Sequence, residues 1–177
     1  MIIKDNFLSE QQFSYIKETI TAENFPWYYC YGVVEPFDLV KGEEKYNQQL
    51  THLFYEGGLP YSEYYYKIVL PFLQLIKPLA LIRCKANMLF ATDSEVVHGW
   101  HRDIEKIDGI DYIGEKHKTA IYYLNTNNGK TYFKTGEIVN SVENRLVIFD
   151  GTKIHTGSSC TDEKIRIVLN FNYIEYN

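Results

Sequence analysis

The sequence predicts a mainly β fold with N-terminal helices, in the α+β class. Apolar residues at helical spacing dominate residues 1–80, and short β-rich runs separated by turn residues fill about 81–177. The chain has 177 residues, which is the length of one domain, and no repeat or linker divides it. We therefore expect a single domain, 1–177, with a helical lead-in at about 1–80 and a β core at about 81–177.

Three helices are expected in the first part of the chain. A capping box that begins at Ser9 predicts the first helix, at about 9–22. The second is expected at about 43–56, because apolar residues recur there at helical spacing and two glycines follow. The third is expected at about 62–76, where Pro71 should kink or split it.

Short β-rich runs follow Pro78. They are Leu81–Ala91, Thr119–Leu124, Thr131–Lys134, Glu137–Val139, Arg145–Phe149 and Lys164–Tyr173. Asn127-Asn128-Gly129 lies between two of these runs and predicts a hairpin turn. Strands at such short, regular spacing are typical of a sandwich, a jelly roll or a barrel.

The last of these runs alternates between apolar and polar residues. One face carries Ile165, Ile167, Leu169 and Phe171, and the other carries Lys164, Arg166, Val168 and Asn170. An antiparallel sheet with one face in water would give this pattern. Alternatively, helices cover the apolar face and the polar face lines a cavity. We favour the cavity, because the amphipathic helices upstream need a surface to pack against.

Composition and charge narrow the classes of function. Hydrophobic residues make up 45% of the chain, which excludes wholesale disorder, and no apolar run approaches the 18 residues of a spanning helix. A net charge of −5 argues against nucleic acid as a partner. Cys30, Cys84 and Cys160 are widely spaced, which favours free thiols in a reducing compartment. We therefore expect a cytoplasmic protein with no membrane partner.

A histidine and an aspartate two residues apart form the first candidate site. On an extended segment, His101 and Asp103 point to the same side. His155, which follows a later apolar strand and a turn, can supply a third ligand. Two imidazoles and one carboxylate on one face of an octahedral ion leave three positions open, an arrangement suited to Fe(II) and oxygen chemistry. Zinc hydrolysis with the same ligands competes with this interpretation, as does a set of ordinary half-buried histidines.

Arg166 lies on the polar face of the alternating strand, soon after His155. A cation that points into a cavity is costly unless an anion pairs with it. A dicarboxylate co-substrate would supply that anion, since arginine can bind a carboxylate through two parallel hydrogen bonds. A protein Asp or Glu is the alternative partner, and Lys164 is the alternative anchor for the co-substrate.

These residues, in this order and within β-rich sequence, resemble the Fe(II)/2-oxoglutarate-dependent dioxygenase superfamily. More narrowly, they resemble its prolyl-hydroxylase-like branch. The supporting segments span about 98–171 and include 98–103, 119–125, 129–133, 144–150 and 155–157. Residues 1–80 resemble the family only as a helical lead-in.

The resemblance implies a double-stranded β-helix, or jelly roll, supported by helices. It implies that His101, Asp103 and His155 are the catalytic residues and hold Fe(II). It further implies that Arg166 and Tyr123 bind the distal carboxylate of 2-oxoglutarate. The implied enzyme is an oxidoreductase, a 2-oxoglutarate-dependent hydroxylase that releases succinate and CO2, with ascorbate as an auxiliary reductant.

Further site residues follow from the same resemblance. Thr131 is expected to add a hydroxyl near the co-substrate or to wall the pocket, and Asn87 to contact the co-substrate. The branch often has a tyrosine near this last position, where the present chain has Leu89. Trp100, beside the first ligand, is a candidate substrate-binding residue, although packing explains it as well. His98 is interpreted as a loop residue that could otherwise touch substrate.

The prime substrate is open between a protein prolyl residue and a small molecule. It should enter over the metal between loops 92–97 and 104–118. The alternative function is a cupin-like metal-dependent dioxygenase or isomerase that does not use 2-oxoglutarate. A non-catalytic binding module that kept the fold is the third interpretation, and the complete set of ligand residues argues against it.

Overall fold

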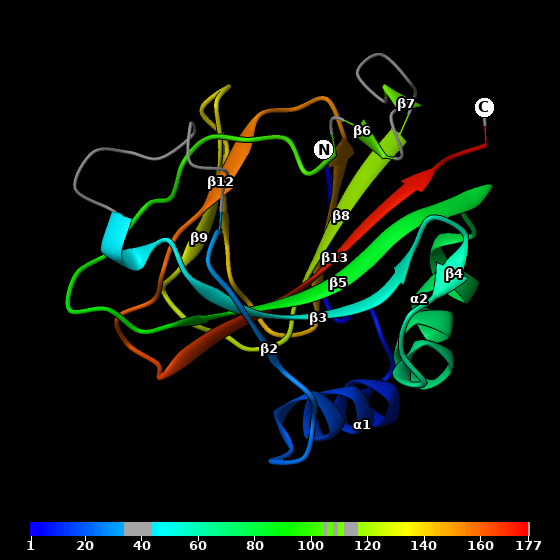
Figure 1. Ribbon diagram of the computed structural model, residues 1–177, viewed down its shortest axis with the longest axis horizontal. Helices are drawn as coiled ribbons and strands as arrows, with labels where there is room; N and C mark the ends of the chain where they lie inside the picture. The colour runs from blue at the N-terminus through cyan, green and yellow to red at the C-terminus, as the bar shows by residue number, and fades with distance from the viewer. Residues whose placement is uncertain (34–43, 105, 108–109, 112–116, 177) are drawn as a thin grey trace.

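The computed structural model describes residues 1–33, 44–104, 106–107, 110–111 and 117–176. Its strands form two main sheets, and two helices lie on the outer side of the larger sheet (Figure 1). All strand pairs in both sheets are antiparallel. This is the mainly β, jelly-roll architecture with supporting helices that the sequence predicts.

Eight strands of the described chain make up the larger sheet. In their order across the sheet they are β1 (Ile2–Lys4), β11 (Arg145–Asp150), β8 (His117–Tyr123), β13 (Ile165–Ile174), β5 (Ala80–Phe90), β3 (Gln49–Glu56) and β2 (Tyr28–Cys30), with β4 (Leu59–Pro60) paired to β3. The smaller sheet contains β10 (Ile138–Asn140), β9 (Lys130–Phe133) and β12 (His155–Gly157), in that order. A short pair, β6 (Lys106–Ile107) with β7 (Ile110–Asp111), lies outside both sheets.

The first predicted helix is confirmed as α1 (Glu10–Thr21). Ser9 is its N-cap, and the Ser9 hydroxyl accepts a hydrogen bond from the Gln12 amide while the Gln12 side chain accepts one from the Ser9 amide. This reciprocal capping satisfies two amides that a helix start leaves without partners. The buried face of α1 consists of Phe13, Ile16 and Ile20, which pack under the larger sheet.

The third predicted helix is also confirmed, and it is divided where Pro71 was expected to divide it. A π-helical turn, Tyr65–Val69, leads into α2 (Leu70–Ile76). Pro71 lies in the first turn of α2, the part of a helix where proline is best tolerated. Lys77 ends the helix in the left-handed region at φ 53°.

The helix predicted at 43–56 is wrong. Residue 43 lies outside the described residues, Glu44–Tyr46 forms a short 3₁₀ turn, and Gln49–Glu56 forms strand β3 between β2 and β5. A bulge between Leu53 and Tyr55 shifts the register of β3 against β5, so the apolar residues mimic helical spacing along a strand. Residues 1–80 therefore contribute four strands to the larger sheet as well as helices.

The hairpin predicted at Asn127-Asn128-Gly129 is also wrong. This segment turns, because the Asn127 side chain accepts a hydrogen bond from the Gly129 amide, but it joins β8 of the larger sheet to β9 of the smaller sheet. Strand β8 already pairs with β11 on one side and β13 on the other, so it has no free edge for β9. The turn thus carries the chain from one layer to the other.

Strand β13 has the two-faced environment that its alternation predicts. Ile167, Leu169 and Phe171 belong to the apolar cluster beneath α1 and α2. Arg166 and Asn170 point to the opposite side and line a pocket between the two sheets. The interpretation in which the polar face meets bulk water is therefore wrong.

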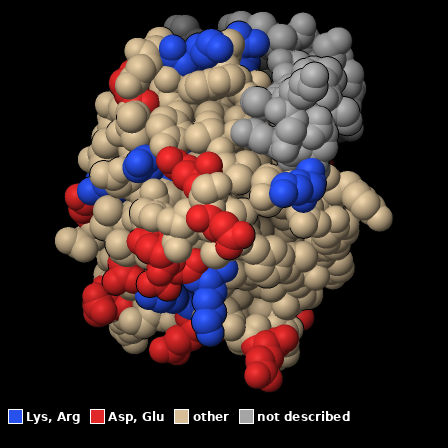
Figure 2. Space-filling model, turned by 90° about the vertical axis from the view of Figure 1, so that its left-hand side faces the viewer, with Lys and Arg blue, Asp and Glu red and all other residues tan. Residues whose placement is uncertain are grey.

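One face of the molecule carries charges of both signs. Figure 2 shows acidic and basic side chains interspersed on one face of the molecule. Cys30, Cys84 and Cys160 are free thiols. No helix within the described residues is long and apolar enough to cross a membrane.

Candidate active site

Three side chains that are distant in sequence converge at one end of the pocket. His101 lies in the segment after β5, and His155 begins β12; their backbones exchange two hydrogen bonds of 3.0 Å. The Nε2 atoms of His101 and His155 lie 3.8 and 3.7 Å from Oδ1 of Asp103. All three potential ligand atoms lie within 4.8 Å of one another, so one ion can reach all of them.

Backbone carbonyls fix which nitrogen of each imidazole faces Asp103. Nδ1 of His101 lies 3.0 Å from the Gly99 carbonyl oxygen, and Nδ1 of His155 lies 3.2 Å from that of Lys153. A carbonyl oxygen can only accept, so each Nδ1 carries a hydrogen, and in the neutral ring Nε2 is the nitrogen that presents a lone pair. Burial lowers the pKa of His155, which favours the neutral form that binds metals.

Asp103 is held from two sides. Its Oδ2 accepts a hydrogen bond from the Asn172 amide at 3.2 Å, and its backbone carbonyl accepts one from the Arg83 guanidinium at 2.7 Å. Burial alone would raise the pKa of Asp103, but the positive charges near it, which include Arg83 and Lys85, lower it further than burial raises it. The carboxylate is therefore ionised and oriented before any ion arrives.

Arg166 lies at the other end of the pocket and is 4% exposed. Its Nε donates to the Ser141 hydroxyl at 2.9 Å, and Nη2 donates to the Thr131 hydroxyl at 3.3 Å. No carboxylate among the described residues pairs with it. Within that part of the chain, the alternative of a protein Asp or Glu partner is therefore wrong. Lys164 is exposed just before β13 and does not line the pocket, so it is not placed as the anchor.

Tyr123 contacts both Arg166 and Thr131. Its ring lies 5.7 Å from the centre of the Arg166 guanidinium, and its hydroxyl donates to Thr131 at 2.8 Å. Burial raises the pKa of Tyr123, so the phenol stays protonated and keeps donating. Thr131 and Arg166 form a buried, positively charged end of the pocket, and Tyr123 contacts both of them from outside the pocket lining.

The remaining predicted site residues divide into two groups. Asn87, Thr131 and Leu89 line the pocket. Trp100 is half-buried and lies under the Lys134 ammonium at 5.0 Å, outside the pocket lining. Most of the loop expected to border the substrate, 104–118, lies outside the described residues.

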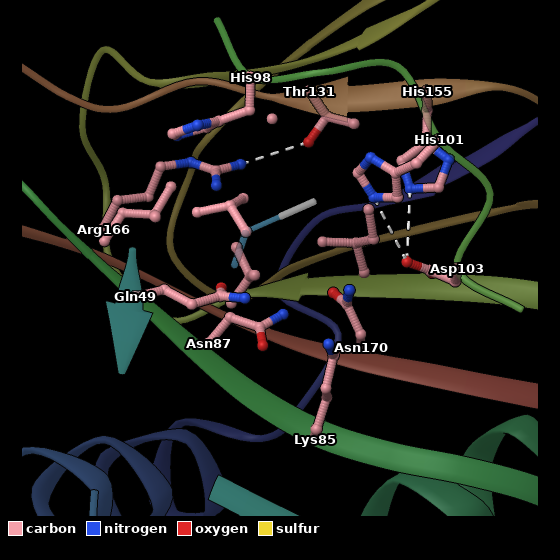
Figure 3. A pocket seen from close by; sticks show the side chains of 15 residues that line it. Gln49, Lys85, Asn87, His98, His101, Asp103, Thr131, His155, Arg166 and Asn170 are labelled. Atoms are coloured by element: carbon pink, nitrogen blue, oxygen red, sulfur yellow. Dashed lines mark hydrogen bonds and ion pairs between the residues drawn. The ribbon is translucent and has the colours of Figure 1, made fainter. Parts of the chain in front are cut away.

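His98 is a pocket residue that the sequence interpretation underestimated. It is 4% exposed, and its Nε2 is buried without a hydrogen-bond partner in the described structure. Burial, then Arg166 and His101, lowers the pKa of His98 to about 4, so its imidazole is neutral at pH 7. It lies beside Arg166 in Figure 3. The conformation of the loop 92–101 brings His98 to this position. No motif or periodicity in the sequence predicts it.

The pocket as a whole separates a metal-binding end from an anion-binding end (Figure 3). Two imidazoles and one carboxylate match the donors that Fe(II) accepts. A buried guanidinium without a described carboxylate partner matches a carboxylate ligand. The residues present therefore fit both an iron ion and a dicarboxylate.

Comparisons with known proteins place this fold. No protein-family model matches the chain, and no curated protein matches it. Among solved structures, an oxidoreductase of the 2OG-Fe(II) oxygenase family from Burkholderia pseudomallei is 12% identical, with a TM-score of 0.65, covering 99% of this chain and 85% of that one. The fold is thus that of the 2-oxoglutarate–Fe(II) oxygenases, as the resemblance implies.

Prolyl hydroxylases are among the similar structures. The viral collagen prolyl hydroxylase of Paramecium Bursaria Chlorella virus-1, in its 2OG complex, is 16% identical, with a TM-score of 0.56, covering 99% of this chain and 96% of that one. A Trichoplax adhaerens prolyl hydroxylase, in complex with a hypoxia inducible factor peptide fragment, is 13% identical, with a TM-score of 0.60, covering 98% and 83%.

Proposed function

We propose that this protein is an Fe(II)- and 2-oxoglutarate-dependent oxygenase that hydroxylates its substrate. The observation that carries the proposal is the unpaired charge of Arg166. The described residues provide no carboxylate for this buried cation, and it shares one pocket with His101, Asp103 and His155. A dicarboxylate that reaches from the metal to the arginine satisfies both ends at once.

His101, Asp103 and His155 would hold the iron. Their lone pairs are already aimed at a common point, because the Nδ1 hydrogens are bound to backbone carbonyls and Asp103 is bound by Asn172. Preorganisation of this kind removes the entropy loss of gathering ligands. With 2-oxoglutarate and O2, the bound iron supplies the oxidising chemistry, and the overall reaction releases succinate and CO2 as substrate is hydroxylated.

Arg166 and Tyr123 would bind the distal carboxylate of 2-oxoglutarate. Ser141 and Thr131 already accept from Nε and Nη2 of the arginine, which leaves Nη1 for a ligand oxygen. Thr131 also receives the Tyr123 hydroxyl, so the three side chains hold one another in place. Asn87 lines the same pocket and would contact the co-substrate. Burial keeps competing water away from these charged groups.

The prime substrate is proposed to be a protein prolyl residue or a small molecule. The prolyl option has support from two similar structures that are prolyl hydroxylases. Trp100 stays a proposed substrate-binding residue. It lies outside the pocket lining, against the Lys134 ammonium.

Succinate formation from 2-oxoglutarate, with Fe(II) and with ascorbate as reductant, tests the proposal. His101→Ala should abolish turnover because it removes a metal ligand. Arg166→Met should raise KM for 2-oxoglutarate by roughly a hundredfold, the expected effect of losing a buried charge-assisted contact. Lys164→Met is the matched control, since it removes an exposed cation next to the same strand and should leave KM unchanged.

Undiminished turnover in both His101→Ala and Arg166→Met would contradict the proposal. Turnover without prime substrate is slow in principle, so binding is measured as well. Calorimetric titration of N-oxalylglycine, a 2-oxoglutarate analogue, into metal-loaded protein should give a signal that Arg166→Met removes. Metal binding without any N-oxalylglycine binding would instead favour the cupin-like alternative.

A further inference from the structure

The floor of the pocket carries a cation that the proposed function does not use. Lys85 lies on β5, opposite Asn170 of β13 in the strand register, and both side chains line the pocket. In Figure 3 the ammonium end of Lys85 points toward Asn170 and into the cavity, on the side of Asp103. Asn87 and Gln49 complete this polar floor, which lies on the larger sheet, away from Thr131 and His155 on the smaller one.

The floor has hydrogen-bonding capacity that the protein itself leaves unused. Oδ1 of Asn87 and Oδ1 of Asn170 are buried without a hydrogen-bond partner in the described structure, and Asn170 is only 8% exposed. Lys85 makes no ion pair with any described residue. A buried polar atom without a partner costs roughly 1–3 kcal/mol. Several such atoms on one wall indicate a surface that a ligand completes.

The balance of charge in the pocket indicates whether that ligand is positively or negatively charged. The pocket lining contains two basic side chains, Lys85 and Arg166, and one carboxylate, Asp103. Under the proposed function, Asp103 and the two carboxylates of 2-oxoglutarate balance the divalent iron and Arg166. Among the described residues that line the pocket, the charge of Lys85 then has no carboxylate left to balance it, because Asp103, the one carboxylate near it there, is used by the iron.

We infer that the prime substrate carries a carboxylate, which Lys85 binds while Asn170 contacts a polar group beside it. This inference rests on the proposed function, because the charge balance assumes iron and 2-oxoglutarate. Burial, and then the neighbouring Arg83, lowers the pKa of Lys85, and an anion beside the ammonium would oppose that shift. Lys85 is thus a specificity-determining residue that selects acids over their neutral amides.

Acetate and acetamide are the minimal probes of this selection, since they differ in charge and little in shape. Protein labelled with nitrogen-15 is loaded with Zn(II) and saturated with N-oxalylglycine, which occupies the Arg166 end. Each probe is then titrated by NMR. Acetate should shift the amide signals of Lys85 and Asn170 saturably, and acetamide should not. Lys85→Met should weaken the acetate response at least tenfold, and Lys67→Met, at an exposed lysine on the helical side, should leave it unchanged.

Three outcomes of the titrations with acetate and acetamide would overturn the inference. These are an acetate response of equal size in Lys85→Met, an equal response to acetamide in the wild type, and no saturable response to acetate at all. Loss of N-oxalylglycine binding in Lys85→Met would also overturn it, since Lys85 would then serve the co-substrate and the proposed function would stand. Failure of N-oxalylglycine to bind the wild type contradicts the proposed function instead.

A second pair of probes distinguishes the source of the carboxylate. N-acetylglycine presents it at the end of a small molecule, and the blocked amino acids Ac-Asp-NH2 and Ac-Glu-NH2 present it on a side chain. Tighter, Lys85-dependent binding of N-acetylglycine assigns a free acid as substrate. Tighter binding of the blocked amino acids assigns an acidic residue in a peptide.

Discussion

The two faces of β13 share the same neighbouring strands. They differ in whether the protein itself supplies contacts for all of their side chains. Toward the helices, Ile167, Leu169 and Phe171 are at most 1% exposed and lie in one apolar cluster. Toward the pocket, Arg166 and Asn170 are nearly as buried, yet one has no described carboxylate partner and the other has an unpaired amide oxygen. The helical face is complete within the protein, whereas the pocket face leaves polar and charged groups without partners among the described residues. Stability and binding should therefore separate along a single strand.

Truncation on the helical face should give the largest effect on stability. Phe171→Ala leaves a cavity beside Phe72, whose ring centre is 4.7 Å away, and should reduce the free energy of unfolding by about 4 kcal/mol. Its neighbour on the pocket face, Asn170→Ala, removes no hydrogen bond of its side-chain oxygen and should cost less than about 1 kcal/mol. Urea unfolding of both variants measures the contrast. Equal losses would show that the pocket face also carries the fold.

The pocket face should instead make stability depend on pH, through His98. Its pKa falls from 6.5 to about 4 on folding, so between these values the unfolded chain binds a proton that the folded protein does not. The free energy of unfolding therefore falls as pH drops through this window, by about 3 kcal/mol at its lower end. His98→Gln does not titrate and should lose correspondingly less stability between pH 7 and pH 4.5.

Urea unfolding of metal-free protein at both pH values tests this. Burial also lowers the pKa values of His52 and His155, so part of the acid sensitivity should survive in the variant. An identical loss in wild type and His98→Gln would mean that water or a neighbour already accommodates the charge of His98.

How far the sequence predicts this site depends on whether a local rule or tertiary packing places each residue. Strand alternation puts Arg166 and Asn170 on one side of β13, and the two-residue spacing of His101 and Asp103 does the same for the metal end. Lys85, two residues before Asn87 on β5, follows the same alternation. That β5 faces the pocket at all, however, is decided by its pairing with β13.

Local rules fail where a strand and a helix share a pattern. Leu50, Leu53 and Phe54 recur at helical spacing, but the segment is β3, where a bulge supplies the extra residue. Pairing with β5 and burial of Phe54 outweigh the helical pattern, and neither can be read from one short window. His98 illustrates the same limit, because a loop path and not a periodicity brings it beside Arg166.

Removal of the buried charge should raise stability while it removes binding. Without ligand, Arg166 is a buried cation with no described carboxylate partner, so Arg166→Met should raise the free energy of unfolding by about 2 kcal/mol. Saturating N-oxalylglycine should stabilise metal-loaded wild type and not the variant. Thermal unfolding with and without the analogue measures both. A variant less stable than the ligand-free wild type would show that the contacts with Ser141 and Thr131 outweigh the buried charge.

The smallest effect should come from Gly129, which shapes the anion end without contributing a side chain. A Cβ atom at this position would lie 2.7 Å from Cδ of Arg166 and 3.0 Å from the carbonyl oxygen of Ser159. The Cβ atom would also lie 2.9 Å from Oδ1 of Asn127. The carbonyl belongs to the backbone, so the side chains of Arg166 and Asn127 are the partners that move. Gly129→Ala should therefore weaken N-oxalylglycine binding roughly tenfold, or about 1.4 kcal/mol, as measured by calorimetry.

Gly136→Ala is the matched control, because it separates a clash with Arg166 from backbone strain. Gly136 has φ +101°, and a Cβ atom added there would have nothing within 4 Å, so alanine at this position is strained without touching the pocket. It should lower the free energy of unfolding by about 1 kcal/mol and leave N-oxalylglycine binding unchanged. If both alanines weaken binding equally, the anion end responds to general loosening of the smaller sheet and not to the position of Arg166. If Gly129→Ala alone weakens it, the rotamer of one buried arginine sets co-substrate affinity, and the pocket face of β13 is tuned by a residue outside that strand.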